Sequence, residues 1–266
     1  MRKGFVLLIL GALLSQCATV PITGRKQVKL LPSSELSSMA LAEYDSFKKN
    51  EKILPDSDQR VKTVREIGNN IAIAVEKFMV GNHMKNRLEE FDWEFNVAEQ
   101  DVLNAWCMPG GKVMFYTGIL PVCDGVGGIA TIMGHEIAHA VARHGNERMS
   151  QGLLVQMGGM GLAAAMEQKP EATEALFMTA YGAGSQLGML KYSRDHESEA
   201  DKMGLVFMIM AGYDAEEAVD FWSRMAANKG GAAPPEFLST HPSDATRIKE
   251  IKEFIPKAKE IAAKYK

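Results

Sequence analysis

"GVGGIATIMGHEIAHAVARHGNERMS", residues 125–150, decides the fold of this chain because its first half is apolar on nearly every side of a helix. Such a helix is stable only inside a core, so we expect one long helix through the centre of the protein. His135 and His139 lie one turn apart on one face of it, with Glu136 beside them. Two imidazoles placed so can bind one Zn²⁺, and the carboxylate can take a proton from water that the metal activates. The pattern predicts a hydrolytic zinc site.

Other interpretations exist for the histidines of this chain. His135 and His139 could be unrelated residues of a core helix, but burying two imidazoles without a partner is costly. His144 is another candidate ligand, but at 100° per residue it lies about 180° from His135 around the helix. We therefore expect His144 to face away from the metal, near the C-terminus of the helix. His83, in the polar "GNHMKNR", is expected to be a solvated loop residue.

A zinc site of this kind needs a third protein ligand, which "SRDHESEADKMG", residues 193–204, can supply. Read as a helix, this stretch places Glu197 and Asp201 one turn apart, on the face that continues into the apolar "LVFMIM". Glu199 lies 200° from Glu197 and is predicted to face water.

An inward carboxylate needs a counter-charge, which Zn²⁺ would supply to Glu197. Asp201, one turn further, is placed to accept the N–H of a ligating imidazole and so orient it. The alternative is a structural network in which both acids pair with basic residues such as Arg194 or Arg247. The spacing alone leaves both readings open.

Several motifs occur in a fixed order along the chain: "TGRKQ" (23–27), "NAWCMPGGKVMFYTGIL" (104–120), "GHEIAHAVARH" (134–144), "SRDHESEADKMG" (193–204) and "STHPSDATRI" (239–248). Together they resemble the gluzincin zinc metallopeptidases of the CAAX-prenyl-protease and HtpX family, metallopeptidase family 48. The sequence is most similar to the bacterial lipoprotein branch of BepA-like and LoiP-like proteases, which is related to Oma-type peptidases.

The resemblance implies roles for individual residues. His135, His139 and Glu197 correspond to the zinc ligands, Glu136 to the catalytic acid and base, and Asp201 to the aspartate behind the ligands. His241 matches a histidine that in relatives can occupy the open zinc position or approach the substrate. Its motif could equally be a helix entry, with the following Pro and Ser starting the last helix.

Two further expectations concern substrate. Arg247, one turn into the last helix, could contact substrate or Asp201. Asn104 and Ala105 match residues on the substrate side of the family's edge strand, which an extended peptide joins through main-chain hydrogen bonds. The alternative for that segment is an internal strand. The resemblance implies one Zn²⁺ per chain and unfolded or misassembled polypeptides as substrates, with an assembly-machinery partner possible.

The N-terminus predicts export. "MRK" followed by the apolar "GFVLLILGALL" has the form of a signal peptide and is too short to span a bilayer. "LSQC" resembles a lipobox that ends at Cys17, which would carry a lipid anchor, although Gln16 departs from the usual small residue. An ordinary cleaved signal or a retained anchor is the alternative. In a Gram-negative source, Ala18 favours the outer membrane over the inner, facing the periplasm.

The rest of the chain fits one domain. A hydrophobic content of 46% excludes a largely disordered protein, and a net charge of −3 gives no field that would attract nucleic acid. Cys107 and Cys123 could form a disulfide in an oxidising compartment or remain buried thiols.

We expect an α+β fold, mostly helical, with a small sheet and the H-E-x-x-H helix in the core. The predicted divisions are a signal peptide (1–17), a tether and lead-in (18–50) and the metallopeptidase domain (51–266).

Local patterns predict further elements. Apolar residues at helical spacing predict a helix that runs to about Phe78, with Ser57 or Asp58 as its N-terminal cap. Period-two alternation predicts strands in "FDWEFNVAE" and "GKVMFYTG", paired in one sheet. Residues 151–190 are expected to form two helices with a break near "EQKPE". Two further helices are expected, one after Asp214 and one after "HPSD".

Overall fold

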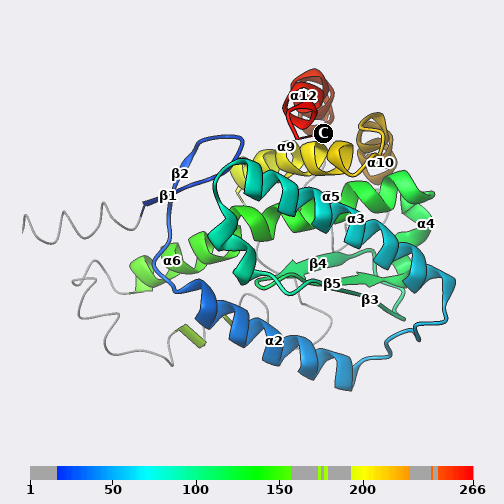
Figure 1. Ribbon diagram of the computed structural model, residues 1–266. Coiled ribbons are helices and arrows are strands. Elements are labelled where there is room, and N and C mark those ends of the chain that lie inside the picture. The colour runs from blue at the N-terminus through cyan, green and yellow to red at the C-terminus, as the bar shows by residue number, and fades with distance from the viewer. Residues whose placement is uncertain are drawn as a thin grey trace, which may run out of the picture.

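The computed structural model describes residues 17–156, 173–174, 177–178, 193–227, 241 and 245–265. Its centre is a pair of crossing helices, α5 (Val126–Ala142) and α9 (Arg194–Met210), which pack closely together (Figure 1). Gly134 and Gly204 meet at the crossing, where a Cβ added to Gly204 would lie 2.9 Å from main-chain atoms of α5. The absence of side chains there lets the two backbones approach. This contact brings the residues of α9 against the face of α5 that carries the histidines.

A three-stranded sheet lies beside α5. Its strands are β3 (Glu94–Ala98), β4 (Ala105–Met108) and β5 (Lys112–Tyr116), in the order β3-β5-β4. β3 runs parallel to β5 and β4 antiparallel to it. The two predicted strands therefore pair in one sheet, as expected, and β4 forms one of its edges.

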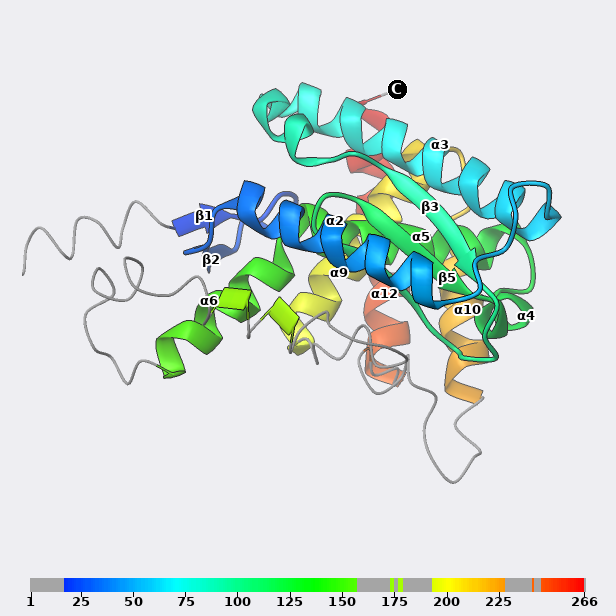
Figure 2. The ribbon, with the colours of Figure 1, turned by 90° about the horizontal axis from the view of Figure 1, so that it is seen from below.

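Both faces of the sheet are covered. On one face, α3 (Gln59–Gly81) and α5 form the main core with apolar side chains such as Phe95 and Val113. On the other face lies α2 (Ser33–Asn50) (Figure 2). It buries residues such as Tyr44 against Trp106. Asp58 caps α3 by accepting a hydrogen bond from the main-chain N–H of Arg60, which confirms the predicted helix start.

The remaining elements frame this core. They are β1 (Cys17–Thr19), β2 (Lys26–Val28), η1 (Lys85–Glu90), η2 (Thr117–Ile119), α4 (Leu120–Cys123), α6 (His144–Gln156), α10 (Glu216–Ala227) and α12 (Ala245–Ala263). β1 and β2 form an antiparallel hairpin near α6. The α+β, mostly helical fold with the H-E-x-x-H helix in the core is confirmed.

The expectation of one long helix over residues 125–150 is wrong. α5 ends at Ala142, and Arg143 adopts a left-handed conformation with φ 59° before α6 begins at His144. Arg143 pairs with Glu90, which holds its side chain while the backbone turns. An unusual φ of this kind is sustained by surrounding contacts that the local sequence does not display. The break redirects every side chain after Ala142.

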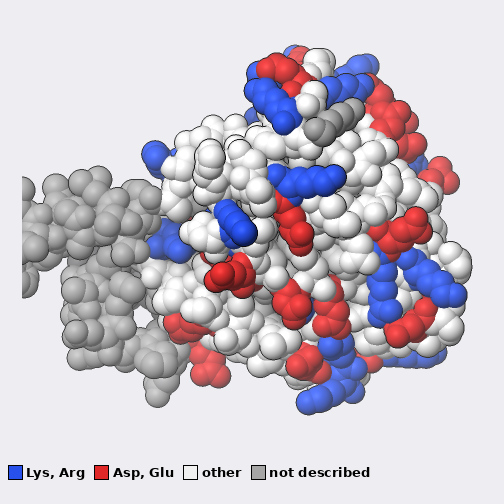
Figure 3. Space-filling view, in the orientation of Figure 1, with Lys and Arg blue, Asp and Glu red and all other residues white. Residues whose placement is uncertain are grey.

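Other expectations stand as follows. Most of residues 151–190, including the predicted break near "EQKPE", lies outside the described residues. Among the described helices, none alone has the length and apolarity to cross a membrane, and one pair, Thr117–Cys123 with Val126–Ala142, passes that test jointly with a 120° bend. On the face seen in Figure 3, basic and acidic side chains are interspersed.

Candidate metal centre

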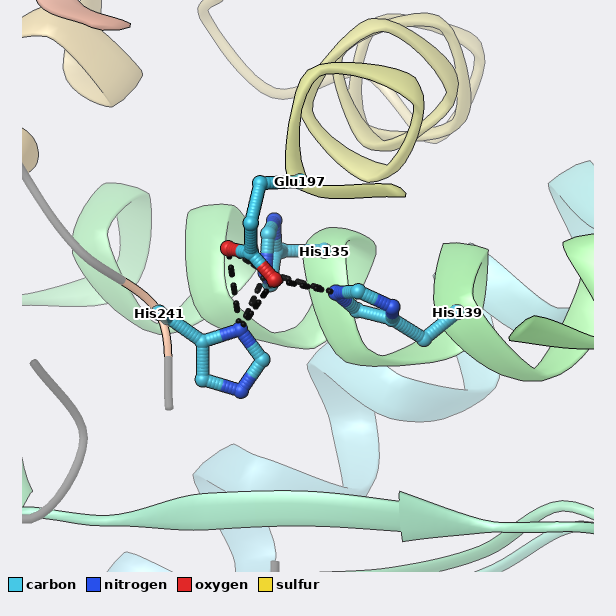
Figure 4. A group of neighbouring side chains, drawn as sticks. All are labelled: His135, His139, Glu197 and His241. Atoms are coloured by element: carbon cyan, nitrogen blue, oxygen red, sulfur yellow. Dashed lines mark hydrogen bonds and ion pairs between the residues drawn. The ribbon is translucent and has the colours of Figure 1, made fainter. Parts of the chain in front are cut away.

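Four buried donor side chains converge between α5 and α9: His135, His139, Glu197 and His241. Figure 4 shows the two imidazoles of α5 pointing toward the carboxylate from α9 and toward His241, which lies just before α12. His135 Nε2 is 3.1 Å from both His139 Nε2 and His241 Nδ1. The Glu197 carboxylate is 2.9 Å from His241 Nδ1, 3.4 Å from His139 Nε2 and 3.5 Å from His135 Nε2.

These separations fit a single tetrahedral metal ion. Zinc binds imidazole nitrogen and carboxylate oxygen at about 2.0–2.1 Å, so adjacent ligand atoms lie roughly 3.3 Å apart. The donors span 2.9–3.5 Å, and they comprise three imidazoles and one carboxylate, a set that suits zinc. The residues present therefore fit one Zn²⁺, with His241 in the position that a catalytic site would leave open to water or substrate.

Glu136 lies beside this cluster and is buried. Its Oε1 has no hydrogen-bond partner within the described part of the chain and is 3.6 Å from His241 Nε2. Burial raises the pKa of Glu136 to about 7, against the opposing effect of His241. A carboxylate with a pKa near neutrality can both accept and return a proton.

Behind His135 stands an ion pair. The Asp201 carboxylate lies 2.9 Å from His135 Nδ1, and Arg247 donates to both Asp201 oxygens at 2.7 and 2.8 Å. Arg247 also donates to Glu197 at 3.0 Å, and its guanidinium lies 3.4 Å above the Trp222 ring. Burial alone would raise the pKa of Asp201, but Arg247 and His135 hold it below its usual value.

Glu197 and Asp201 both point into the core, as their helical phase predicted. The two readings of these acids coexist, because Arg247 pairs with each of them while Glu197 also faces His135 and His139. Of the two roles expected for Arg247, the structure places it against Asp201.

The prediction that Glu199 faces water is wrong. Glu199 is 4% exposed, and it accepts hydrogen bonds from Thr23 and from Arg25 Nε, the latter at 2.8 Å. The helical phase was read correctly, but the loop of the β1–β2 hairpin covers that face of α9. Sequence spacing cannot reveal a cover supplied by a segment more than 170 residues away.

The prediction that His144 faces away is also wrong. Because α5 ends before it, His144 turns back, and its Nδ1 lies 2.9 Å from His139 Nδ1. Its Nε2 lies 3.1 Å from Glu199 Oε2. Burial lowers the pKa of His144 to about 4, although the hydrogen bond with Glu199 opposes this. His144 is thus next to a candidate ligand without belonging to the ligand cluster.

A second buried polar cluster surrounds this contact. Arg25 donates to both oxygens of Glu147 at 2.6 and 2.8 Å, and Glu147 is 3.0 Å from His196 Nε2. The His144 and His196 rings stack with centroids 4.4 Å apart. His196 had no role assigned from the sequence. The signal that could have revealed the cluster is "TGRKQ", whose Thr23 and Arg25 make these contacts.

The expected substrate strand is β4, at the sheet edge. Asn104 is buried, and its side-chain oxygen accepts a 2.9 Å hydrogen bond from the Ala105 N–H. The Tyr116 N–H donates to the Asn104 carbonyl, so the alternation of an antiparallel ladder turns the main-chain groups of Ala105 away from β5, toward the edge that carries no partner strand among the described residues.

The other residues singled out in the sequence lie as follows. His83 is exposed, as expected. Cys107 and Cys123 are free and buried, and burial raises the pKa of Cys123 to about 12. Cys17 begins β1.

An H-E-x-x-H helix with a carboxylate from a later helix at the same point defines the gluzincin class of metallopeptidase centres. Residues 68–255 match Peptidase family M48, and the chain belongs to that family. It is 36% identical over 183 residues to the mitochondrial metalloendopeptidase OMA1 of Saccharomyces cerevisiae, covering 65% of this chain and 50% of the relative.

Two more relatives extend the comparison. The mitochondrial metalloendopeptidase OMA1 of Homo sapiens is 30% identical over 249 residues, which cover 91% of this chain and 46% of that protein. The beta-barrel assembly-enhancing protease of Escherichia coli is 26% identical over 165 residues, 60% of this chain and 34% of that protein. The chain thus spans about half the length, or less, of these relatives.

Proposed function

We propose that this protein is a zinc-dependent endopeptidase that hydrolyses peptide bonds in unfolded or misassembled polypeptides of the cell envelope. The observation that carries the proposal is the convergence of His135, His139 and Glu197 at tetrahedral spacing with Glu136 beside them. Membership of family M48, whose matched relatives are named as metalloendopeptidases, supports the same activity.

In this proposal the residues divide the work. Zn²⁺, when bound, supplies a Lewis acid that polarises a carbonyl oxygen and acidifies water. His135, His139 and Glu197 hold it. Glu136 accepts the proton of the attacking water and passes it to the leaving amine, which its raised pKa suits. Asp201 and Arg247 orient His135 and Glu197.

The substrate would bind as an extended strand along β4. A sheet edge without a partner strand would offer main-chain groups that any peptide can pair with, so selectivity for sequence would be loose. Asn104 would hold this edge in place through its bond to the Ala105 N–H. Such binding suits unfolded chains, because a folded protein rarely offers a free strand.

His241 would act as a latch. Its Nδ1 lies within 3.1 Å of His135 Nε2 and of the Glu197 carboxylate, where a fourth ligand would stand. A water molecule or substrate carbonyl needs that position, so the arrangement described corresponds to a latent enzyme. Movement of His241 would open the site.

We place the protein in the envelope, exported and anchored through a lipid on Cys17, facing the periplasm and in the outer membrane if the source is Gram-negative. The predicted signal peptide and lipobox support this location. One matched relative is named for enhancing beta-barrel assembly, which makes an assembly-machinery partner reasonable.

A second function follows from the latch: a largely latent protease that acts as an envelope chaperone or assembly factor. The observation that favours it is His241 at the fourth ligand position. A His241→Ala variant distinguishes the two. Faster proteolysis of an unfolded substrate would establish a latch, whereas an unchanged rate would show that His241 does not gate cleavage.

The test of the proposal is metal analysis combined with casein hydrolysis on the full chain, with and without a chelator. We expect one zinc per chain, loss of hydrolysis with chelator, and recovery on adding zinc. Glu136→Gln should retain zinc and lose cleavage. Equal hydrolysis by Glu136→Gln and the unaltered protein would exclude Glu136 as the base.

A further inference from the structure

The two candidate ligands on α5 are held at their outer nitrogens by different partners. His135 Nδ1 meets Asp201 directly, at 2.9 Å. His139 Nδ1 faces His144 Nδ1 at 2.9 Å, and His144 Nε2 in turn faces Glu199 at 3.1 Å. His144 thus stands between His139 and a carboxylate.

The far end of this series belongs to the N-terminal hairpin. Arg25 donates to Glu199 Oε2 through Nε at 2.8 Å, and Thr23 bonds Glu199 Oε1. Both residues lie in the loop between β1 and β2. The series Arg25–Glu199–His144–His139, which we name the long arm, therefore joins the start of the described chain to the metal centre.

The direction of the hydrogen bonds follows from the arginine. A guanidinium can only donate, so Glu199 accepts as a carboxylate. The His144 nitrogen that faces Glu199 must then carry a hydrogen, which leaves Nδ1 of a neutral His144 as an acceptor. His139 can satisfy it only by donating from its own Nδ1. A neutral imidazole protonated at Nδ1 has its lone pair on Nε2, the nitrogen that faces the other donors.

We propose that Arg25, acting through Glu199 and His144, is a positioning residue that fixes the tautomer and ring orientation of His139 for zinc binding. The β1–β2 hairpin thereby helps to position a ligand of the metal centre. This inference rests on the proposed function, since it assigns a role toward the same zinc site.

A second metal site is the main rival explanation of this buried cluster, and its charges argue against it. Arg25 already supplies the cation, with side-chain contacts to Glu147 and to Glu199. Within the described ranges, only His135, His139, Glu197 and His241 form a group whose ligand atoms lie close enough for one ion.

The other rival is simple anchoring of the hairpin, and Gln27 provides its control. Gln27 is buried on the same hairpin and donates a 2.9 Å hydrogen bond to the Ala142 carbonyl, without touching the long arm. Gln27→Leu should loosen the hairpin and leave the tautomer of His139 unchanged. Arg25→Met keeps an unbranched side chain but removes the donors.

The experiment uses the full chain labelled with ¹⁵N-histidine, which gives signals from only six residues. In the metal-free protein we expect His139 as the Nδ1–H tautomer and His144 as the Nε2–H tautomer. Arg25→Met should give His139 a mixture of tautomers and raise the zinc dissociation constant about 10–100-fold, measured by competition with a chelator. Arg25→Lys should recover part of the affinity, because one ammonium replaces a fork of donors.

Gln27→Leu should lower the urea midpoint of the metal-free protein and change the zinc dissociation constant less than twofold. His144→Phe should reproduce the loss of zinc affinity seen in Arg25→Met. If Arg25→Met or His144→Phe binds zinc as tightly as the unaltered chain, the long arm has no positioning role. If the unaltered chain binds no zinc, the proposed function fails instead, and the tautomer of His139 still reports on the arm separately.

Discussion

Two series of hydrogen bonds hold the two α5 histidines, and both end in an arginine. The short arm, Arg247–Asp201–His135, lies wholly within the helical core, and its arginine side chain is 7% exposed. The long arm has one more link, and the side chain of Arg25 is 28% exposed. The same chemical task is therefore done once by neighbouring core helices and once by a hairpin from the N-terminal end. The difference predicts that the short arm is stiffer and costlier to break.

The largest effect is expected from breaking the short arm at Arg247. Arg247→Met leaves the buried carboxylate of Asp201 without the guanidinium that pairs with it and removes one of the partners of Glu197, which should cost about 3–5 kcal/mol of folding stability. Urea unfolding and zinc content would measure the loss. Arg247→Lys should restore little, because one ammonium cannot serve both acids and stack on Trp222. A wild-type unfolding midpoint in Arg247→Met would refute the difference between the arms.

A somewhat smaller effect is expected at the helix crossing on which the short arm depends. Gly204→Ala would put a Cβ 2.9 Å from main-chain atoms of α5, and overpacking of this kind costs about 1–3 kcal/mol. Separation of α9 from α5 should also weaken zinc binding, measured against a chelator. Ser198→Ala, at a half-buried position of α9 whose hydroxyl bonds Glu250 at the surface, is the control and should change both quantities little. If Gly204→Ala binds zinc as tightly as the unaltered chain, the close approach of α5 and α9 does not determine the geometry of the metal centre.

The smallest effect concerns Glu147, beside the long arm. Burial would raise the pKa of Glu147, but hydrogen bonds from Arg25 and His196 lower it to about 2 from an ordinary 4.5. The stability it adds is complete above about pH 4.5 and is lost as the pH falls toward 2. Glu147→Gln should therefore be less stable than the unaltered chain at pH 7, with the gap closing below pH 4.5 in urea titrations.

The exposed pair of Lys257 and Glu260 serves as the control for that titration. Such a surface pair contributes little, so Glu260→Gln should follow the unaltered chain at every pH. A gap for Glu147→Gln that stays constant between pH 7 and pH 3 would mean that its ion pair with Arg25 does not stabilise the fold.

The sequence predicted the short arm well because its logic is local. Helical phase on a single helix separates Glu197 and Asp201 from their neighbours, and H-E-x-x-H is read on another. The helix that begins after Asp58 and the two predicted strands are confirmed, since their apolar spacing matches the faces that the core covers.

The long arm was not predicted from the sequence, because it depends on contacts between residues that are far apart in the chain. The phase of Glu199 is as predicted, but Arg25 and Thr23 come from far away to cover it. His144 was placed by extending a helix that stops at Ala142, where Arg143 turns with a positive φ and pairs with Glu90. A non-glycine residue with positive φ and a cover from a distant hairpin both arise from tertiary contacts.

The most direct test of the account is crystallography of the zinc-loaded full chain at the zinc absorption edge. We predict one anomalous peak per chain, about 2.0–2.1 Å from His135 Nε2, His139 Nε2 and the Glu197 carboxylate, with His241 or a water molecule as the fourth neighbour. A zinc peak elsewhere, or Glu197 bonded to Arg247 alone, would contradict the account.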